Sequence, residues 1–284
     1  MTSTGSSLRS WPRRVNLTRV FISFLSDFGL QDDFVGTCHG VIARIAPEAR
    51  VIDVTHGVPA QHVLQGALVL ANTLPFLPPG VHLAVVDPGV GSPRRALALR
   101  DAEGRTFVGP DNGLLVPAAE RAGIAAAHEI TNPSYALDFV SRTFHGRDIF
   151  APAAAHLALG VPLEELGPPL SPDALVRLDL PEPQIGQSRI GCTILYVDSF
   201  GNIALNLTRT DATSAGIAPG TQVELELAGE RVYAIAARTF GDARAGDIIL
   251  YEDSYGNMSV AISGGDAAQM LHARAGQPLR INVG

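Results

Sequence analysis

A carboxylate and an arginine lie seven residues apart in a short loop that is rich in glycine and proline. Asp87 follows an apolar run, and Arg94 comes after the segment PGVGSP at positions 88–93. The prolines restrict φ on both sides of the glycines, so the loop is predicted to be stiff and to return the guanidinium toward the carboxylate. Such a pair could polarise a water molecule. An Asp–Arg pair on an ordinary surface turn would contribute little, and this loop alone leaves both interpretations open.

Other polar side chains also stand where predicted strands or helices begin or end. They are Asp27, Asp111, Asn112, His145, Arg147 and Asp148 in the first part of the chain and Asp198, Asn202 and Ser254 in the second. No Ser or Cys nucleophile stands beside a base, which argues against covalent catalysis. Asp, Arg and His side chains together suit either the activation of water or a binding role. No histidine pair has the spacing of metal ligands on one helix, so no metal site is predicted.

The elements that would position these groups alternate between strand and helix in the first part of the chain. Strands are predicted at 20–25, 50–54, 81–86, 96–99, 106–108 and 126–130, and helices at 34–45, 62–74 and 149–159. This alternation indicates βαβ units and a largely parallel sheet. Ligand sites of such proteins form at the carboxyl ends of the strands, which is where Asp27 and Asp87 are expected.

The pattern changes after a proline-rich stretch, where apolar residues begin to repeat with a period of two. Short strands are predicted at 192–197, 203–207, 223–227, 231–237, 248–251, 258–262 and 278–283, which indicates an all-β barrel-like or sandwich module. Two turns share the pattern Asp-Ser-aromatic-Gly-Asn, at 198–202 and 253–257. We therefore predict an α/β fold with a disordered leader at 1–17, an N-terminal α/β domain at 18–170, a linker at 171–187 and a C-terminal β-barrel domain at 188–284.

Composition excludes several kinds of partner. The formal net charge of −7 disfavours nucleic acid and anionic membranes, and it tolerates a cationic small molecule. No apolar run approaches the ~20 residues of a membrane span. The only cysteines, Cys38 and Cys192, are far apart and are predicted to be small buried side chains in a reducing compartment, so we expect a cytoplasmic protein.

Five segments, in order, resemble one enzyme family. They are SDFGLQDDFVGTCHGVI at 26–42, DPGVGSPRR at 87–95, GPDNGLL at 109–115, TFHGRDIFAPAAAHLA at 143–158 and DSFGNIALN at 198–206. Together they are similar to the S-adenosyl-L-methionine (SAM) hydroxide adenosyltransferases, which form adenosine from SAM and are related to the fluorinases and chlorinases. The resemblance implies a trimer whose active sites lie between subunits. It also implies hydrolysis of SAM at the ribose 5′ carbon, with no cofactor and no metal.

By that resemblance, the Asp-Arg-His triad of the hydrolases falls on Asp87, Arg94 and His145. Further matched positions are implied to hold the substrate: Asp27 the ribose hydroxyls, Asp32 and Asp198 the methionine amine, Ser254 the methionine carboxylate, and Asn202 the adenine, assisted by the backbone from Ile262 to Gly264.

Two departures separate the chain from the halogenases. They use an aromatic residue at the place of Asp87 and a small halide-contacting residue at the place of Gly146. A halogenase arginine near the methionine carboxylate is Tyr255 here. A carboxylate would repel a halide, so hydrolysis is preferred over halogenation. A SAM- or adenosine-binding protein with little turnover is the third reading.

Overall fold

The computed structural model describes residues 20–186 and 188–283, which form two compact units divided between Val176 and Arg177. The predicted leader at 1–17 lies outside the described residues. The predicted domain limits and the linker at 171–187 stay predictions. Among the described residues, no helix has the length and apolar character to span a membrane.

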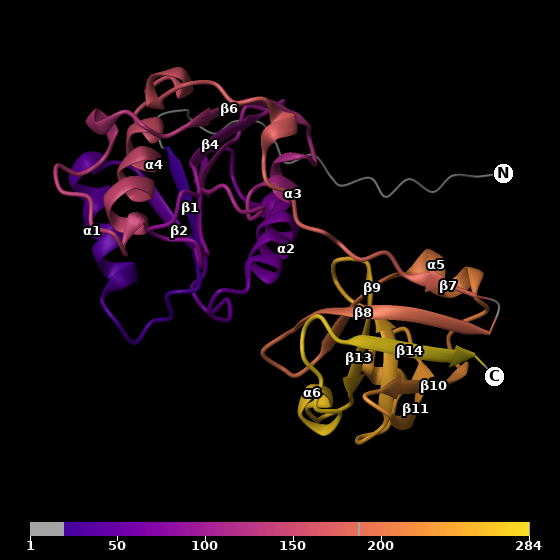
Figure 1. Ribbon diagram of the computed structural model, residues 1–284. Coiled ribbons are helices and arrows are strands. Elements are labelled where there is room, and N and C mark those ends of the chain that lie inside the picture. The colour runs from indigo at the N-terminus through magenta and orange to yellow at the C-terminus, as the bar shows by residue number, and fades with distance from the viewer. Residues whose placement is uncertain (1–19, 187, 284) are drawn as a thin grey trace, which may run out of the picture. The chain divides into compact units, whose positions relative to one another are not determined.

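The first unit contains a six-stranded sheet (Figure 1). Its strands are β1 (Phe21–Ser26), β2 (Arg50–Thr55), β3 (Val81–Val85), β4 (Ala96–Asp101), β5 (Thr106–Pro110) and β6 (Ile124–Glu129). The strand order is β2-β1-β3-β5-β4-β6, in which β2, β1, β3 and β5 are mutually parallel and β4 is antiparallel to both of its neighbours. The largely parallel sheet predicted from the alternation is confirmed.

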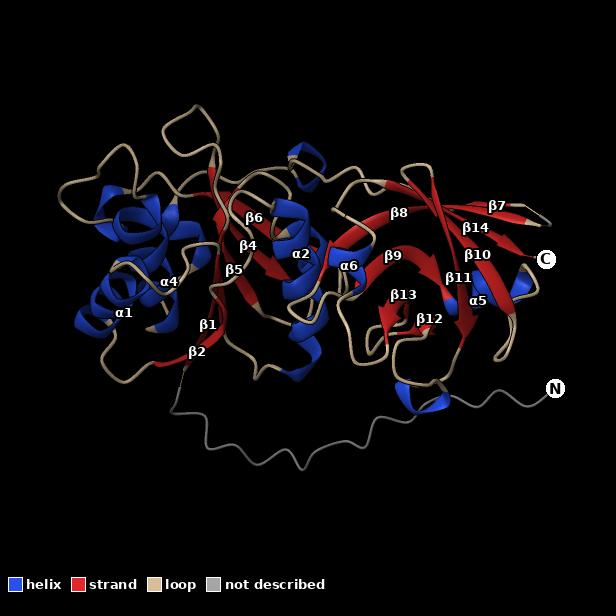
Figure 2. Cartoon of the chain, turned by 90° about the horizontal axis from the view of Figure 1, so that it is seen from below, coloured by secondary structure: helices blue, strands red, loops and turns tan. Residues whose placement is uncertain are grey.

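Helices cover both faces of this sheet. The α-helices are α1 (Phe34–Ile45), α2 (Val63–Thr73), α3 (Val116–Ala119) and α4 (Ala151–Ala158), with short 3-10 turns at η1 (Leu74–Phe76), η2 (Pro133–Tyr135), η4 (Leu163–Leu166) and η5 (Pro172–Ala174). Figure 2 shows α1 and α4 on one face and α2 on the other. The strands β2 and β3 lie on opposite sides of β1 in the sheet. The helix α1 connects β1 to β2, and α2 connects β2 to β3. The strand order therefore reverses between β1 and β3, and ligands of open α/β sheets bind at the carboxyl end of such a reversal.

The helix predicted at 149–159 begins earlier and with a wider turn. A π-helical turn, η3 (Gly146–Phe150), precedes α4. Pro152 has no N–H to donate to the carbonyl of Asp148, which instead accepts a hydrogen bond of 2.9 Å from the backbone N–H of Leu137. Single π turns of this kind are frequent at functional sites, and this one begins directly after His145.

The core of the first unit lies where α1 and α4 pack on β1 and β3. Phe24, Leu83 and Phe150 are fully buried there. The strands of a parallel sheet are covered on both faces, which explains why these strands read as continuous apolar runs in the sequence.

The second unit is a closed barrel with short helices. Its strands are β7 (Gln184–Ile185), β8 (Arg189–Val197), β9 (Ile203–Thr208), β10 (Gln222–Leu227), β11 (Glu230–Ala236), β12 (Ile248–Glu252), β13 (Asn257–Ile262) and β14 (Pro278–Val283). Its helices are α5 (Arg209–Ser214), η6 (Phe240–Asp242) and α6 (Ala267–Met270). Pairing of β14 with β8 closes a seven-stranded ring, with β7 added beside β8. The predicted C-terminal β-barrel is confirmed.

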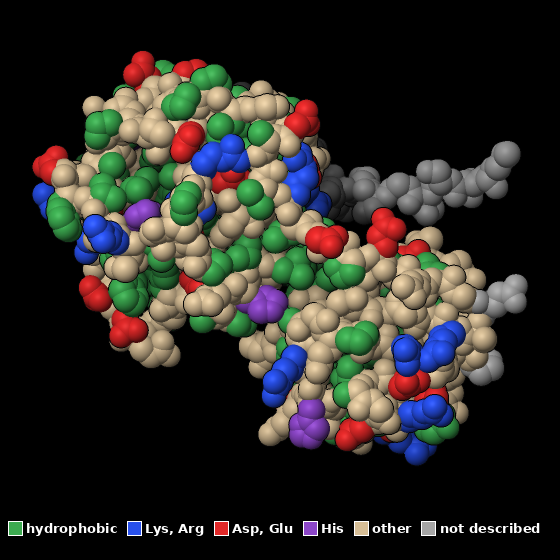
Figure 3. Space-filling view, in the orientation of Figure 1, with side chains coloured by type: hydrophobic (Ala, Val, Ile, Leu, Met, Phe, Trp, Pro, Cys, Tyr) green, Lys and Arg blue, Asp and Glu red, His purple; other side chains and the backbone are tan. Residues whose placement is uncertain are grey.

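Acidic and basic side chains are interspersed on the face of each unit that Figure 3 shows. The described residues on this face therefore present no extended basic surface, as expected from the net charge of −7.

Candidate active site

Two carboxylates follow neighbouring strands at the point where the strand order reverses. Ser26 at the end of β1 is paired with Val85 at the end of β3, so Asp27 and Asp87 leave the same edge of the sheet. The side chain of Asp87 is 7% exposed. The expectation that both carboxylates stand at the rim of the sheet is met by this register.

The structure brings Asp87, Arg94 and His145 together. Arg94 Nε donates to Asp87 Oδ1 at 2.9 Å and to Oδ2 at 3.1 Å, and its Nη2 also bonds Oδ2. The same Nη2 lies 2.8 Å from His145 Nδ1. The guanidinium is thus the central member of the cluster, and the donors on Nη1 are not used by either partner. With its side chain 10% exposed, Arg94 is far from an ordinary surface residue.

The contact with Arg94 sets the state of His145. A guanidinium can only donate, so Nδ1 is the acceptor and the proton of the neutral ring stays on Nε2. Burial, and then the positive charge of Arg94, lower the pKa of His145 from 6.5. At neutral pH this histidine is therefore an uncharged ring that presents an N–H.

The loop between Asp87 and Arg94 is held by its neighbours. The side-chain amide of Asn112 donates to the carbonyl of Val86 at 2.8 Å and fixes the end of the strand. Gly91 has φ of +79°, and a Cβ there would lie 2.8 Å from the carbonyl oxygen of Arg142. This glycine lets the loop pass close to the segment that carries His145.

The guanidinium of Arg94 stacks on the ring of Phe150. The ring centroid lies 5.1 Å from Arg94 Cζ, a cation–π distance, and the ring is fully buried. Sequence reasoning missed this residue, because an apolar position in an alanine-rich helix carries no signal beyond its place in the core.

Three aromatic side chains pack beside the segment that carries His145, and the sequence did not predict this cluster either. Phe28, Phe34 and Phe144 contact one another, with ring centroids 5.0–5.8 Å apart. A Cβ on Gly146 would lie 2.9 Å from the Phe28 ring. Gly146 is therefore small because the aromatic cluster packs against it.

The other predicted positions of the first unit are Asp27 and Asp32. Asp27 Oδ2 accepts a hydrogen bond of 2.8 Å from the backbone N–H of Gln61. Among the described residues, no hydrogen bond to Oδ1 is found. Asp32 is exposed in the turn before α1.

The predicted positions of the second unit lie on two turns of matching geometry. Asp198 Oδ1 accepts from the backbone N–H groups of Phe200 and Asn202 at 2.9 Å, and Asp253 Oδ1 accepts from the equivalent Tyr255 and Asn257 at 2.8 and 3.0 Å. The repeated Asp-Ser-aromatic-Gly-Asn pattern therefore encodes one kind of turn, used twice.

The side chains of these two turns differ in whether they are already hydrogen-bonded within the turn or are exposed. The amide of Asn202 donates to Asp198 Oδ2 at 2.8 Å, while Ser254 and Tyr255 are exposed. Ile262 ends β13, and Gly264 is exposed in the turn that follows.

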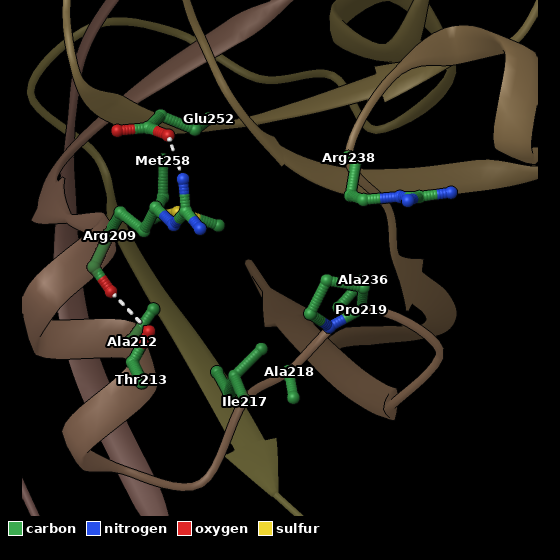
Figure 4. A pocket seen from close by; sticks show the side chains of 10 residues that line it. All are labelled: Arg209, Ala212, Thr213, Ile217, Ala218, Pro219, Ala236, Arg238, Glu252 and Met258. Carbon is green, nitrogen blue, oxygen red and sulfur yellow. Dashed lines mark hydrogen bonds and ion pairs between the residues drawn. The ribbon is translucent and has the colours of Figure 1, made fainter.

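A pocket in the second unit is lined by residues other than the predicted site residues (Figure 4). Arg209 on its wall pairs with Glu252 at 3.1 Å, and α5 supplies one side of it. None of the ten residues drawn in Figure 4 is a predicted site residue. This pocket does not belong to the candidate active site.

Comparison with known proteins identifies both units. Residues 22–167 match the SAM hydroxide adenosyltransferase N-terminal domain, and residues 192–280 match the C-terminal domain. A Salinispora arenicola protein named (R)-S-adenosyl-L-methionine hydrolase is 49% identical, over 93% of this chain and 98% of its own length. A Thermus thermophilus protein of the same name is 41% identical, over 92% and 98%.

More distant relatives complete the comparison. An Actinoplanes fluorinase is 32% identical, over 92% of this chain and 96% of its own. The solved structure of an uncharacterized conserved protein from Thermotoga maritima matches with a TM-score of 0.85 at 36% identity, over 92% of this chain and 99% of the other. With both of its domains matched in order, the chain belongs to the SAM hydroxide adenosyltransferase family.

Proposed function

We propose that this protein hydrolyses SAM to adenosine and L-methionine. The observation that carries the proposal is the partly buried cluster in which Arg94 joins Asp87 to His145 at the carboxyl edge of the sheet. Relatives that are 41–49% identical are named for this reaction, and the fluorinase is more distant at 32%.

The difficulty in this reaction is the nucleophile. The sulfur of SAM is a sulfonium, so methionine leaves as a neutral thioether and needs no general acid. In our proposal a water oxygen forms a bond to the ribose 5′ carbon, the carbon–sulfur bond breaks with its electron pair moving to sulfur, and Asp87 accepts the proton of the water. Arg94 and the Nε2–H of His145 orient the water and stabilise its developing hydroxide character.

The remaining positions are proposed to align the substrate for this in-line attack. The side chain of Asp27 is suited to the ribose because one oxygen is anchored by Gln61 and the other can accept from a hydroxyl. The proposed contacts elsewhere are Asp32 and Asp198 with the methionine amine, Ser254 with its carboxylate, and Asn202 and the backbone from Ile262 to Gly264 with adenine.

We further propose a homotrimer with its sites at subunit interfaces, a cytoplasmic location and a chemical step that uses no metal and no cofactor. The two buried thiols, Cys38 and Cys192, support a reducing compartment. The proposed assembly rests on family resemblance and would be tested by light scattering.

Product analysis in oxygen-labelled water tests the function directly. Purified protein incubated with SAM should yield adenosine that carries the label in its 5′ hydroxyl, together with methionine. Adenosine without label would mean that its 5′ oxygen came from a group other than water, and 5′-methylthioadenosine would show that a different carbon–sulfur bond was cleaved. Tight adenosine binding with no product over hours would instead favour a binding protein.

The pH dependence of the reaction tests the state of His145. The neutral ring accepts from Arg94, whereas a protonated ring would turn an N–H toward the guanidinium. Activity should therefore be retained at neutral pH and lost as the pH falls through the pKa of His145, which lies below 6.5. The measurement is kcat/KM against pH, with His145→Gln as the variant in which this acid limb should move or vanish. A midpoint above 6.5, or an unchanged limb in the variant, would contradict the assignment.

A further inference from the structure

A second cluster of chemically capable side chains lies beside the candidate active site. His39 comes from α1, Asp53 from β2, and His56 from the loop that follows β2. Asp53 Oδ1 lies 2.8 Å from His39 Nε2 and 3.1 Å from His56 Nε2. One ligand atom from each residue lies within 4.8 Å of the other two.

His56 provides an independent observation. Its side chain is 3% exposed, and its Nε2 is buried without a hydrogen-bond partner among the described residues, although Asp53 is only 3.1 Å away. The other ring nitrogen, Nδ1, lies 2.7 Å from Ser26 Oγ. With the ring proton on Nδ1, donated to that hydroxyl, the Nε2 lone pair faces the Asp53 carboxylate, and a cation between the two atoms would satisfy both.

We propose that His39, Asp53 and His56 form a binding site for one Zn²⁺-class divalent transition-metal ion. Two imidazole nitrogens and one carboxylate oxygen suit this class rather than Mg²⁺ or Ca²⁺, which prefer all-oxygen ligands. Three protein ligands leave the fourth position of a tetrahedral ion to water. This proposal does not depend on the hydrolytic function.

Neighbouring side chains orient the two histidines in the way that second-layer residues orient histidines in known metal sites. A metal-bound histidine usually donates its second ring N–H to a fixed acceptor, and Ser26 Oγ stands in that place for His56. The buried ring of Phe24 packs against both histidines, with centroids 4.6 Å from His56 and 6.0 Å from His39. Both imidazole rings are therefore positioned by contact with the same apolar side chain.

The spacing of the ligand atoms requires only small adjustments, since Asp53 Oδ1 lies 2.8 and 3.1 Å from the two histidine nitrogens and all three atoms lie within 4.8 Å of one another. Bonds of about 2.0–2.1 Å place the ligand atoms of a tetrahedral zinc ion roughly 3.3 Å apart. His39 and Asp53 have side chains 35% and 44% exposed, so both can turn toward the ion while the buried His56 stays in place.

An ion here would stabilise the loop that carries Asp27. Ser26 Oγ, bonded to His56, also accepts from the backbone N–H of Phe28 at 3.3 Å, and the carbonyl of His56 accepts from Gly29 at 2.8 Å. The ion would therefore tie the segment after β2 to the segment after β1. It stays outside the proposed chemical step, which uses Asp87, Arg94 and His145.

Metal titration of the full chain tests the site. Protein stripped with a chelator and then dialysed would be titrated with ZnCl₂ by calorimetry and with CoCl₂ by visible absorption. We expect one Zn²⁺ per chain, a tetrahedral Co²⁺ spectrum, no matching heat from MgCl₂ and a higher Tm with zinc. His39→Gln and Asp53→Asn should each weaken zinc binding at least ~100-fold, since loss of a ligand exceeds the roughly 10–100-fold effect of losing a second-layer partner.

His272→Asn is the matched control, because His272 is exposed in the second unit, far along the chain from the three ligands. It should bind zinc like the unmodified protein. Circular dichroism would verify that each variant is folded, and Asp53→Asn serves alone if His39→Gln is not. The proposal is overturned if the unmodified chain takes up no ion in this way, or if the folded ligand variants bind zinc with unchanged affinity.

Discussion

Replacing Arg94 by alanine is expected to lower kcat for SAM hydrolysis by at least ~10³-fold while KM changes little. The reason is that one guanidinium makes two sets of contacts, the pair of bonds to Asp87 and the bond to His145 Nδ1. Its loss leaves the carboxylate without its partner, frees the histidine ring to turn, and removes the positive charge that stabilises hydroxide character. Steady-state kinetics with chromatographic detection of adenosine measures the effect.

Two further variants sharpen this test. Arg94→Lys keeps the charge, but an ammonium cannot reproduce the planar fork that reaches two Asp87 oxygens and His145, so turnover should stay at least ~10²-fold low. Arg100→Ala removes an arginine whose partner, Glu164, lies 3.8 Å away on an exposed surface, and it should leave kcat unchanged. A lysine variant with full activity would mean that charge alone suffices and that the bridging geometry has no catalytic role.

The parts of the fold that depend on local sequence were predictable. Strands buried on both faces gave continuous apolar runs, and β1, α1 and β3 begin and end within a residue or two of their expected limits. Closure of the barrel could not be predicted from local sequence. The pairing of β8 with β14 joins segments roughly ninety residues apart, such as Ile190 and Ile281, and local periodicity cannot specify it.

The same distinction applies to the sites. The stiff loop predicted that Arg94 returns to Asp87, because proline and glycine act over a few residues. His145 lies 51 residues beyond Arg94; its place before a helix made it a candidate, but only the family resemblance joined it to Asp87 and Arg94. The one-helix spacing rule could not find the cluster of His39, Asp53 and His56, because its members come from a helix, a strand and a loop.

The second large effect is expected from Asp87→Asn, which preserves shape and removes the negative charge. Water would lose its proton acceptor, and turnover to adenosine should fall by about 10²–10⁴-fold. The measurement is adenosine formation from SAM in chloride-free buffer. Asp138→Asn, at an exposed acidic position of the same unit, is the control and should retain full activity. Hydrolysis at the unmodified rate in Asp87→Asn would show that this carboxylate is not the base.

The same variant tests why the protein would choose water over halide. In the native cluster the carboxylate of Asp87 neutralises Arg94 and repels an anion at the nucleophile's position. In Asp87→Asn the guanidinium keeps its charge, and the amide can donate a hydrogen bond, so chloride should gain access to the 5′ carbon. Mass spectrometry of reactions containing KCl should then detect 5′-chloro-5′-deoxyadenosine, which the unmodified protein should not form. If hydrolysis falls but no chlorinated product forms, the discrimination against halide comes from the shape of the site and not from the charge of Asp87.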